Sequence, residues 1–328
     1  MANIKVGTIV CWRNSSPILA IFRLIPEEGS KFPSYKAGQY IALRRDDCRL
    51  TKKVVKEDRK VEYVTILDAS GNPKRGPVTH SYSIASAPFE TLERGYLEFY
   101  VILEIDEKGV RGRLTESMFR MSPEKDNKLI YYDKIAGDFT LEKRADGMKN
   151  VVLVGTGTGI APFISMIKQL DHEAGQGKSD SARYTVLHTN RTYEELDYTK
   201  EFREIEKAGR FDFVYVPSVS RPTPRDLEDP TMGKGRANNL LRHMLGMPLK
   251  EEQDVEEAEA RGEDAAKAKS GLSKTVRPVL PSQHELRELR DRMDPASTVI
   301  ITCGNPWSME DIKYIAESNR MRFEKEDW

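Results

Sequence analysis

The chain has 328 residues, of which 38% are hydrophobic, and its 52 basic side chains balance its 52 acidic ones. This length is enough for two domains of ordinary size, and the sequence contains no apolar run near the roughly 20 residues that cross a membrane. The N-terminus lacks the pattern of a signal peptide. The three cysteines are scattered, which excludes a four-cysteine iron–sulfur module and indicates a reducing cytoplasm as the location.

The first part of the chain, up to about residue 141, consists of short β-rich runs. This pattern is typical of a small antiparallel barrel. Strands are predicted at residues 6–12, 18–24, 40–43, 61–67, 79–84, 97–103 and 129–132, with one basic helical stretch at 112–121. We therefore predict a six-stranded antiparallel β-barrel domain over residues 1–145, which ends in the polar linker 142–147.

From residue 150 onward, strands alternate with amphipathic helices, which predicts a parallel α/β sheet covered on both faces. Strands are predicted at 151–154, 184–188, 213–217 and 298–302, and helices at 161–170, 200–207, 237–244 and 309–316. Residues 248–290 interrupt this alternation, because they are rich in charged and small side chains until a helical run at 285–293. We interpret that segment as an inserted surface loop with one solvated helix in a nucleotide-binding domain over residues 146–328. A mobile decoration is favoured over a partner contact.

A glycine-rich loop directly follows the apolar strand 151–154. Its residues are Gly155, Thr156, Gly157, Thr158 and Gly159. The order of strand, glycine turn and helix predicts a phosphate-binding turn, since free N–H groups and the helix dipole favour an anion there. Glycine lets the backbone approach the phosphates closely. The spacing is not the G-x-G-x-x-G of a Rossmann fingerprint.

Three further segments give the chain a resemblance to a known family. His80-Ser81-Tyr82-Ser83-Ile84-Ala85-Ser86-Ala87-Pro88 alternates like a strand, Tyr35-Lys36-Ala37-Gly38-Gln39-Tyr40 precedes it, and Cys303-Gly304-Asn305-Pro306 lies near the C-terminus. In this order, the chain resembles the ferredoxin–NADP reductase family. The Leu97–Tyr100 strand, the Gly137-Asp138-Phe139 turn and the terminal Trp328 are similar to its bacterial branch. The resemblance covers most of the chain apart from about 45–75 and 248–290.

The resemblance implies that FAD binds to the first domain; the residues themselves leave FMN open. Tyr82 would stack on the flavin and Ser83 would place its hydroxyl near flavin N5, with Ile84 and Ser86 in the same motif. His80 departs from the family, because an arginine usually reaches the flavin pyrophosphate from that position, whereas a histidine charge is conditional. The alternatives are that His80 still contributes or that it only fills a strand position.

A compensation for His80 is conceivable at the predicted helix 112–121. In relatives, a Gly-x-x-Ser/Thr pattern begins this helix, whose first N–H groups hold the pyrophosphate. Here Arg111 or Gly112 takes the hydroxyl position and Arg113 follows. We hypothesise that Arg111 or Arg113 supplies the charge that His80 gives up.

The second domain carries residues that favour NADPH over NADH. Arg191, Ser220 with Arg221, and Arg236 each follow a predicted strand or turn in contexts that hold the 2′-phosphate in the bacterial branch. Forked guanidinium groups suit a phosphate, whereas an NAD site would present a carboxylate to the ribose.

Two further residues would face the nicotinamide. In the family, the position of Cys303, before Gly304, lies against the nicotinamide, with packing as its expected role. Trp328 would lie over the flavin face that the nicotinamide must reach, and would move for hydride transfer.

The resulting functional prediction is a reductase that moves electrons between NADPH and a separate ferredoxin or flavodoxin by hydride transfer to flavin N5. Basic side chains cluster between residues 44 and 60, where they could dock an acidic carrier or form a solvated hairpin. The alternatives are the reductase component of an oxygenase, an NAD(P)H–flavin reductase, and a non-catalytic flavin or nucleotide sensor. We expect a monomer or weak dimer with no metal and no nucleic-acid partner.

Overall fold

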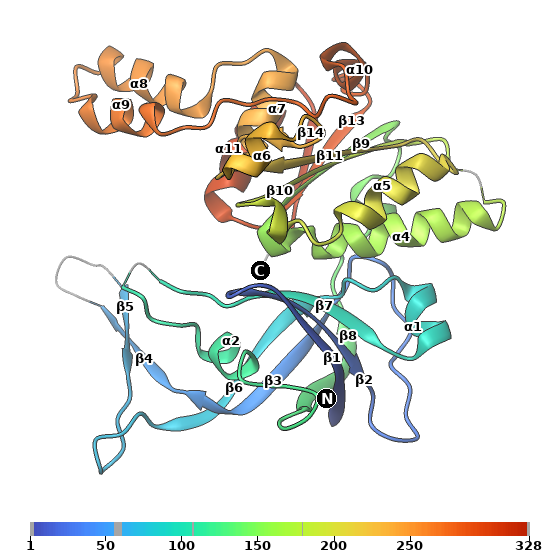
Figure 1. The fold of residues 1–328 in the computed structure, drawn as a ribbon, viewed down its shortest axis with the longest axis vertical. Helices are drawn as coiled ribbons and strands as arrows, with labels where there is room; N and C mark the ends of the chain where they lie inside the picture. The colour runs from blue at the N-terminus through green and yellow to red at the C-terminus, as the bar shows by residue number, and fades with distance from the viewer. Residues whose placement is uncertain (1–2, 56–60, 107, 179, 327–328) are drawn as a thin grey trace. The chain divides into compact units, whose positions relative to one another are not determined.

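A computed structural model describes residues 3–55, 61–106, 108–178 and 180–326 of the chain. The chain divides into two compact units, residues 1–138 and 139–328. Each unit is described by itself below, with the element labels of Figure 1. Among the described residues, no helix has the length and apolar character of a membrane-spanning segment.

The first unit is built on a six-stranded antiparallel sheet, which confirms the predicted architecture. Its strand order is β6-β3-β8-β1-β2-β7. A separate two-stranded ribbon, β4-β5, follows β3, and two short helices complete the unit. The bounds are β1 Ile4–Ser16, β2 Leu19–Ile25, β3 Tyr40–Arg49, β4 Thr51–Val55, β5 Val61–Thr65, β6 Arg75–Ser83, α1 Pro88–Arg94, β7 Leu97–Ile102, α2 Arg113–Met118 and β8 Lys128–Ala136.

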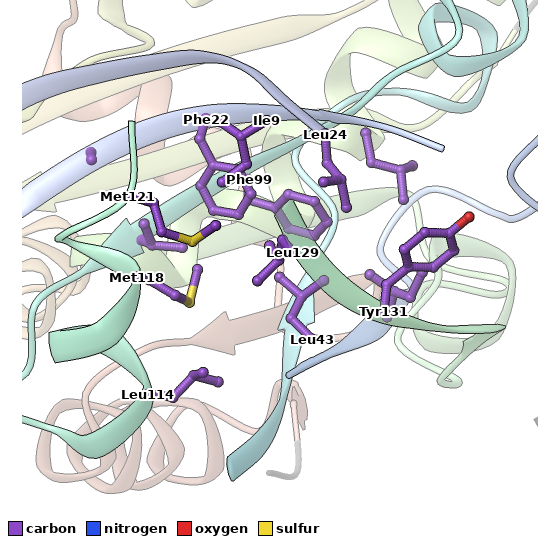
Figure 2. Close-up of a cluster of buried hydrophobic side chains, with 14 of the residues drawn as sticks. Ile9, Phe22, Leu24, Leu43, Phe99, Leu114, Met118, Met121, Leu129 and Tyr131 are labelled. Atoms are coloured by element: carbon purple, nitrogen blue, oxygen red, sulfur yellow. The ribbon is translucent and has the colours of Figure 1, made fainter. Parts of the chain in front are cut away.

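The core of this unit lies on one face of the sheet and is closed by α2. Figure 2 shows its side chains converging from the strands and from Leu114 and Met118 of α2. Phe22 is fully buried between two other rings, with its centroid 5.3 Å from Trp12 and 4.9 Å from Phe99. The stack of the fully buried Phe22 and Phe99 rings with the half-buried Trp12 fixes the strands firmly against one another. The sheet therefore gives β6 a rigid support.

The second unit contains a six-stranded parallel sheet with the order β12-β11-β10-β9-β13-β14, as the alternating pattern predicted. Figure 1 shows α4 and α5 on one face of this sheet and α7 and α11 on the other. The bounds are α3 Leu141–Arg144, β9 Asn150–Thr156, η1 Gly157–Ile160, α4 Ala161–Gly175, β10 Arg183–Asn190, η2 Tyr193–Glu195, α5 Thr199–Ala208, β11 Phe213–Val219, α6 Pro224–Glu228, β12 Gly233–Lys234, α7 Ala237–Leu245, α10 Leu286–Asp291, β13 Thr298–Cys303, α11 Pro306–Ser318 and β14 Arg322–Lys325.

A buried ion pair joins α7 to α11 beneath this sheet. Arg242 is fully buried, and its guanidinium donates to both carboxylate oxygens of Asp311, at 3.0 and 2.5 Å. Asn238 donates to the same carboxylate at 2.7 Å. Because buried charges must be paired and hydrogen-bonded, this cluster fixes the two helices in one register.

The inserted segment differs from the predicted single solvated helix. It forms two helices, α8 Lys250–Ala260 and α9 Ala266–Ser273, that pack against each other and extend from the end of α7 (Figure 1). Asn239 of α7 holds the first turn of α8, accepting from Lys250 N at 3.0 Å and donating to Glu251 at 2.7 Å. The chain then returns beside β12, where Lys234 and Val279 exchange two backbone hydrogen bonds of 2.9 and 3.0 Å. The insertion is therefore anchored to the sheet at both its beginning and its end.

Candidate functional site

The glycine-rich loop follows β9 as predicted and runs through the single turn η1 into α4. Gly157 has a φ of +58°, and no described atom lies within 4 Å of the position that a Cβ would take there. Within the described part of the chain, no side chain caps the start of η1 or of α4. The loop therefore leaves an open approach to backbone N–H groups, which is what a phosphate requires.

This loop lies at the point where the order of the strands reverses. The chain places β10, β11 and β12 in turn on one side of β9, and then crosses to place β13 on the other side. In open parallel sheets, ligands bind at this switch point, beyond the carboxyl ends of the strands. The end of β9 is Thr156 and the end of β13 is Cys303, so the structure brings the two predicted nucleotide motifs together.

Close backbone packing joins these two loops. Asn305 N donates to the Thr156 hydroxyl at 2.9 Å. A Cβ at Gly159 would overlap the Cys303 carbonyl, and a Cβ at Gly304, whose φ is +129°, would overlap Thr156. Both glycines are therefore required for the loops to meet.

The predicted phosphate-binding residues lie along the carboxyl ends of β10, β11 and β12, and we call this set the arginine edge: Arg191, Ser220, Arg221 and Arg236. Backbone hydrogen bonds hold neighbouring loops together there, with Arg221 N donating to Arg191 O at 2.8 Å and Ser220 N donating to Asn190 O at 2.9 Å. The structure thus gathers all four residues at one edge of the sheet.

Two of the three arginines already have carboxylate partners. Arg191 donates from Nε to Glu195 at 2.8 Å, and a second contact joins its Nη2 to the same carboxylate. Arg236 Nη1 lies 3.1 Å from Glu251 Oε1. Arg221 is exposed and forms no ion pair with the residues that the structure describes. The edge is therefore less positive than its three arginines suggest.

Cys303 is fully buried at the end of β13, and its thiol donates to Glu326 Oε2 at 3.0 Å. Burial and the neighbouring Glu326 carboxylate raise the pKa of the Cys303 thiol well above its ordinary value. The side chain is accordingly a neutral hydrogen-bond donor rather than a reactive thiolate.

In the first unit, the remaining resembling segments converge around β6. The side-chain amide of Gln39 donates to Gly137 O at 2.8 Å, and the backbone carbonyl of Gln39 accepts from Ile84 N at 3.0 Å. Tyr40 pairs with Ser83 across the β3–β6 ladder. Segments that are separated by about a hundred residues in sequence therefore form one side of the sheet.

Tyr82 and His80 lie on the same face of β6, because successive side chains of a strand point to opposite sides. Tyr82 packs partly against the barrel core, and burial together with the Glu104 carboxylate raises the pKa of its phenol. His80 is exposed and Ser83 is buried. Ser86 is fully buried and accepts from Glu98 N at 3.0 Å, so its side chain holds the segment after β6 to β7.

The helix α2 begins beside this strand and is bound to β3. Gly112 is its N-cap, with the exposed Arg111 before it and the half-buried Arg113 after it. Arg49 of β3 donates to the Arg111 carbonyl at 2.6 Å. A Cβ at Gly112 would lie only 2.7 Å from the Glu104 carboxylate, which places this acidic group at the start of α2.

Comparisons with known proteins agree with this geometry. The model of the oxidoreductase NAD-binding domain family matches residues 153–255. A ferredoxin–NADP reductase from Pseudomonas aeruginosa is 29% identical over 190 residues, which are 54% of this chain and 64% of that protein. A flavohemoprotein from Halalkalibacterium halodurans is 24% identical over 68% of this chain and 45% of its own length. The chain thus spans less than two thirds of the length of either curated relative.

A solved structure agrees over the whole chain. It is a ferredoxin NADP+ reductase from Neisseria gonorrhoeae with bound FAD and NADP, with a TM-score of 0.59 at 18% identity over 99% of both chains. The chain is similar in sequence and in fold to the ferredoxin–NADP reductase family. The family model that matches residues 153–255 is that of an NAD-binding domain, and the solved structure holds FAD and NADP.

The residues present fit the two cofactors that the solved structure holds. In the second unit, the open loop at Gly157 and the unpaired Arg221 suit an anionic dinucleotide. In the first unit, the half-buried Tyr82 ring offers an apolar platform beside the buried Ser83. Arg113 forms no ion pair within the described part of the chain and is available to a pyrophosphate.

Sequence reasoning missed the carboxylates of the two candidate sites: Glu104 in the first unit, and Glu195, Glu251 and Glu326 in the second. Each reaches its partner through the fold or through a short local turn, and its sequence neighbours carry no distinctive pattern. The parallel pairing of β13 with β14 brings Glu326 to Cys303, and only that pairing could have indicated the contact. The predicted role of Trp328 falls outside the described residues.

Proposed function

We propose that this chain is an NADPH-dependent flavoprotein reductase that exchanges electrons with a ferredoxin or flavodoxin. The observation that carries the proposal is the meeting of the Gly155–Gly159 loop and the Cys303–Gly304 turn at the topological switch point of the parallel sheet. The ordered convergence of the β6 motif with Gln39 and Gly137 in the first unit supports a flavin site in the same chain.

In the second unit, the chain binds and orients the dinucleotide. Backbone N–H groups from Gly157 to Gly159 would hold the pyrophosphate at the start of α4. The arginine edge would hold the 2′-phosphate, with the exposed Arg221 and Arg236 as its most accessible cations. Cys303, kept neutral by burial and by Glu326, would serve as uncharged packing behind the nicotinamide site.

In the first unit, the chain holds the flavin. Tyr82 would cover one face of the ring and Ser83 would donate a hydrogen bond near N5, with Ile84 supporting the strand. Arg111, Gly112 and Arg113 at the start of α2, together with His80, would hold the pyrophosphate. A bound FAD supplies hydride acceptance and stepwise electron release, which no amino-acid side chain provides. We further propose that Trp328 covers the second flavin face.

We propose the β4–β5 ribbon as the docking surface for an acidic carrier, because the neighbouring arginines of β3 are already paired with carboxylates. Arg44 pairs with Asp46 at 2.7 Å, Arg45 pairs with Asp126 at 2.5 Å, and Arg49 lies 3.5 Å from Glu116, so these arginines are largely neutralised. Lys52 and Lys53 are exposed on β4, and residues 56–60 of the basic cluster lie outside the described part of the chain. We propose Lys52 and Lys53 as the groups that attract the carrier.

The cysteines support a cytoplasmic reductase. Cys11, Cys48 and Cys303 are all free thiols, as a reducing compartment requires. Cys48 and Cys303 are buried, which protects them from oxidation.

The proposal is tested first by the colour of the purified chain. We expect a flavin absorbance spectrum, and FAD rather than FMN by mass after release. We then expect NADPH to bleach the flavin anaerobically, faster than NADH does. A colourless protein that cannot be reconstituted and that fails to reduce ferricyanide from NADPH would refute the assignment and leave the sensor alternative.

The carrier is tested by comparing acceptors at equal concentration. Steady reduction of ferredoxin or flavodoxin well above that of free FMN supports the proposed partner. Preferential reduction of free FMN supports a flavin reductase instead. The match to a flavohemoprotein, a protein that is not named as a ferredoxin reductase, is the observation that keeps an oxygenase-type reductase as the second candidate. Lys52→Glu/Lys53→Glu should raise the KM for the carrier without changing ferricyanide reduction.

A further inference from the structure

We propose that two carboxylates, Glu195 and Glu251, weaken the preference of the arginine edge for a 2′-phosphate, so that the inserted helices help to set coenzyme choice. The inference rests on the proposed dinucleotide site of the second unit. The two carboxylates would reduce the difference in affinity between a ribose with a 2′-phosphate and a ribose without one.

Arg191 is the more completely neutralised arginine. Its Nε and Nη2 both face the carboxylate of Glu195, four residues along the chain. The Glu195 side chain is only 6% exposed, against 33% for Arg191. Since a bidentate pair occupies the side of the guanidinium that would grip a phosphate, Arg191 has only part of its donor set left for a ligand.

Arg236 is paired by the insertion. Its Nη1 lies 3.1 Å from Glu251 Oε1, while the other oxygen of that carboxylate accepts from the buried Asn239 at 2.7 Å. The Glu251 side chain is 12% exposed and therefore fixed, whereas that of Arg236 is 66% exposed. The pair thus places a stationary negative charge beside a solvent-facing cation.

The insertion confines Arg236 from a second side as well. Gly235, directly before it, has a φ of +107°, and a Cβ there would lie 3.1 Å from Pro278 of the returning segment. The loop that carries Arg236 is therefore enclosed between α8 and residues 276–279. The segment that interrupts the α/β pattern is part of the wall of the proposed coenzyme site.

The charges decide the direction of the effect. Three guanidinium groups and two carboxylates leave the edge with one net positive charge. A 2′-phosphate carries a charge of about −1.5 to −2 at neutral pH. Each carboxylate repels that phosphate, so removal of either negative charge should tighten binding of the phosphorylated ribose and leave a ribose without phosphate unaffected.

The test is isothermal titration calorimetry of the full chain with adenosine 2′,5′-bisphosphate and with 5′-AMP. We expect Glu251→Gln to bind the bisphosphate about three- to tenfold more tightly than the wild type, with unchanged affinity for 5′-AMP. Glu195→Gln should act in the same direction. The gain should shrink in 0.5 M salt, because the effect is electrostatic.

Glu256→Gln is the matched control, since it removes the same charge from an exposed position of α8 that contacts no arginine of the edge. Weaker or unchanged bisphosphate binding in both Glu251→Gln and Glu195→Gln, with 5′-AMP binding intact, overturns the inference. An equal gain in Glu256→Gln also overturns it. If wild-type protein binds neither nucleotide, the proposed function itself fails, and the inference fails with it. Circular dichroism checks the fold, and Glu195→Gln remains informative if loss of Glu251 loosens α8.

Discussion

His188 should make the folded protein sensitive to mild acid. The side chain is fully buried on β10, with its Nδ1 3.0 Å from the Tyr215 hydroxyl and its ring edge-on to Phe202. Its Nε2 has no hydrogen-bond partner among the described residues. Burial lowers the pKa of His188 to about 3, from an ordinary value near 6.5. The folded protein therefore keeps this imidazole neutral at any pH above about 3, whereas the unfolded chain protonates it below about 6.5.

The sign and size of the effect follow from this difference in pKa. Because the unfolded chain takes up the proton first, stability is fully present above pH 6.5 and is lost as the pH falls from 6.5 toward 3. Each pH unit in that range costs about 1.4 kcal/mol, so the free energy of unfolding should fall by about 2 kcal/mol between pH 8 and pH 5 through this residue alone.

The assay is urea unfolding of the wild type, of His188→Gln and of the control His243→Gln at pH 8 and pH 5. Gln cannot titrate and can still hydrogen-bond with Tyr215. We expect His188→Gln to be less stable at pH 8, but to lose about 2 kcal/mol less than the wild type on going to pH 5. His243→Gln is the control because it makes the same substitution at a partly exposed position of α7. Equal pH dependence in the wild type and His188→Gln would refute the reasoning.

Three further predictions concern packing and thiol chemistry. Arg242→Met should cost about 3–5 kcal/mol of stability in urea unfolding, because it leaves the Asp311 carboxylate buried without its cation, and adding Asp311→Leu should recover much of that loss. Gly304→Ala should weaken binding of adenosine 2′,5′-bisphosphate at least tenfold, since its Cβ would displace the loop at Thr156, and unchanged affinity would contradict the proposed role of that turn. In native protein at pH 8, iodoacetamide should modify the half-buried Cys11 and leave Cys303 intact, as mass spectrometry of the peptides would show, because the buried thiol of Cys303 stays protonated.

The sequence predicted the elements whose signal is local. The strands β9 and β13 are built around continuous apolar runs, and such runs are typical of strands that are buried on both faces of a sheet. The strand β14 was missed because its residues, Arg322–Lys325, are all half-buried and it is held by pairing with β13 rather than by its own composition. The helix α9 was missed because its eight residues are small or polar apart from Leu272 and include Gly271, so its stability comes from packing on α8.

The candidate site divides in the same way. Glycine loops and arginines after strands can be placed from sequence, because the carboxyl ends of parallel strands share one edge of the sheet. The carboxylates that pair with these residues could not be predicted from sequence. Glu251 meets Arg236 because of the insertion, and Glu326 meets Cys303 because β14 pairs with β13. The sequence therefore located the groups that would bind ligand better than it estimated the charge of the site.

The pairing of Lys234 with Val279 has a consequence for anyone who shortens this chain. The strand β12 lies at the margin of the parallel sheet, and the returning segment caps its exposed backbone groups through two hydrogen bonds. An uncapped margin invites intermolecular strand addition and aggregation. A shortened chain without α8 and α9 should therefore retain residues 276–281, joined to α7 by a short linker. Removal of the whole segment would leave β12 as an unpaired edge strand that can pair with another molecule.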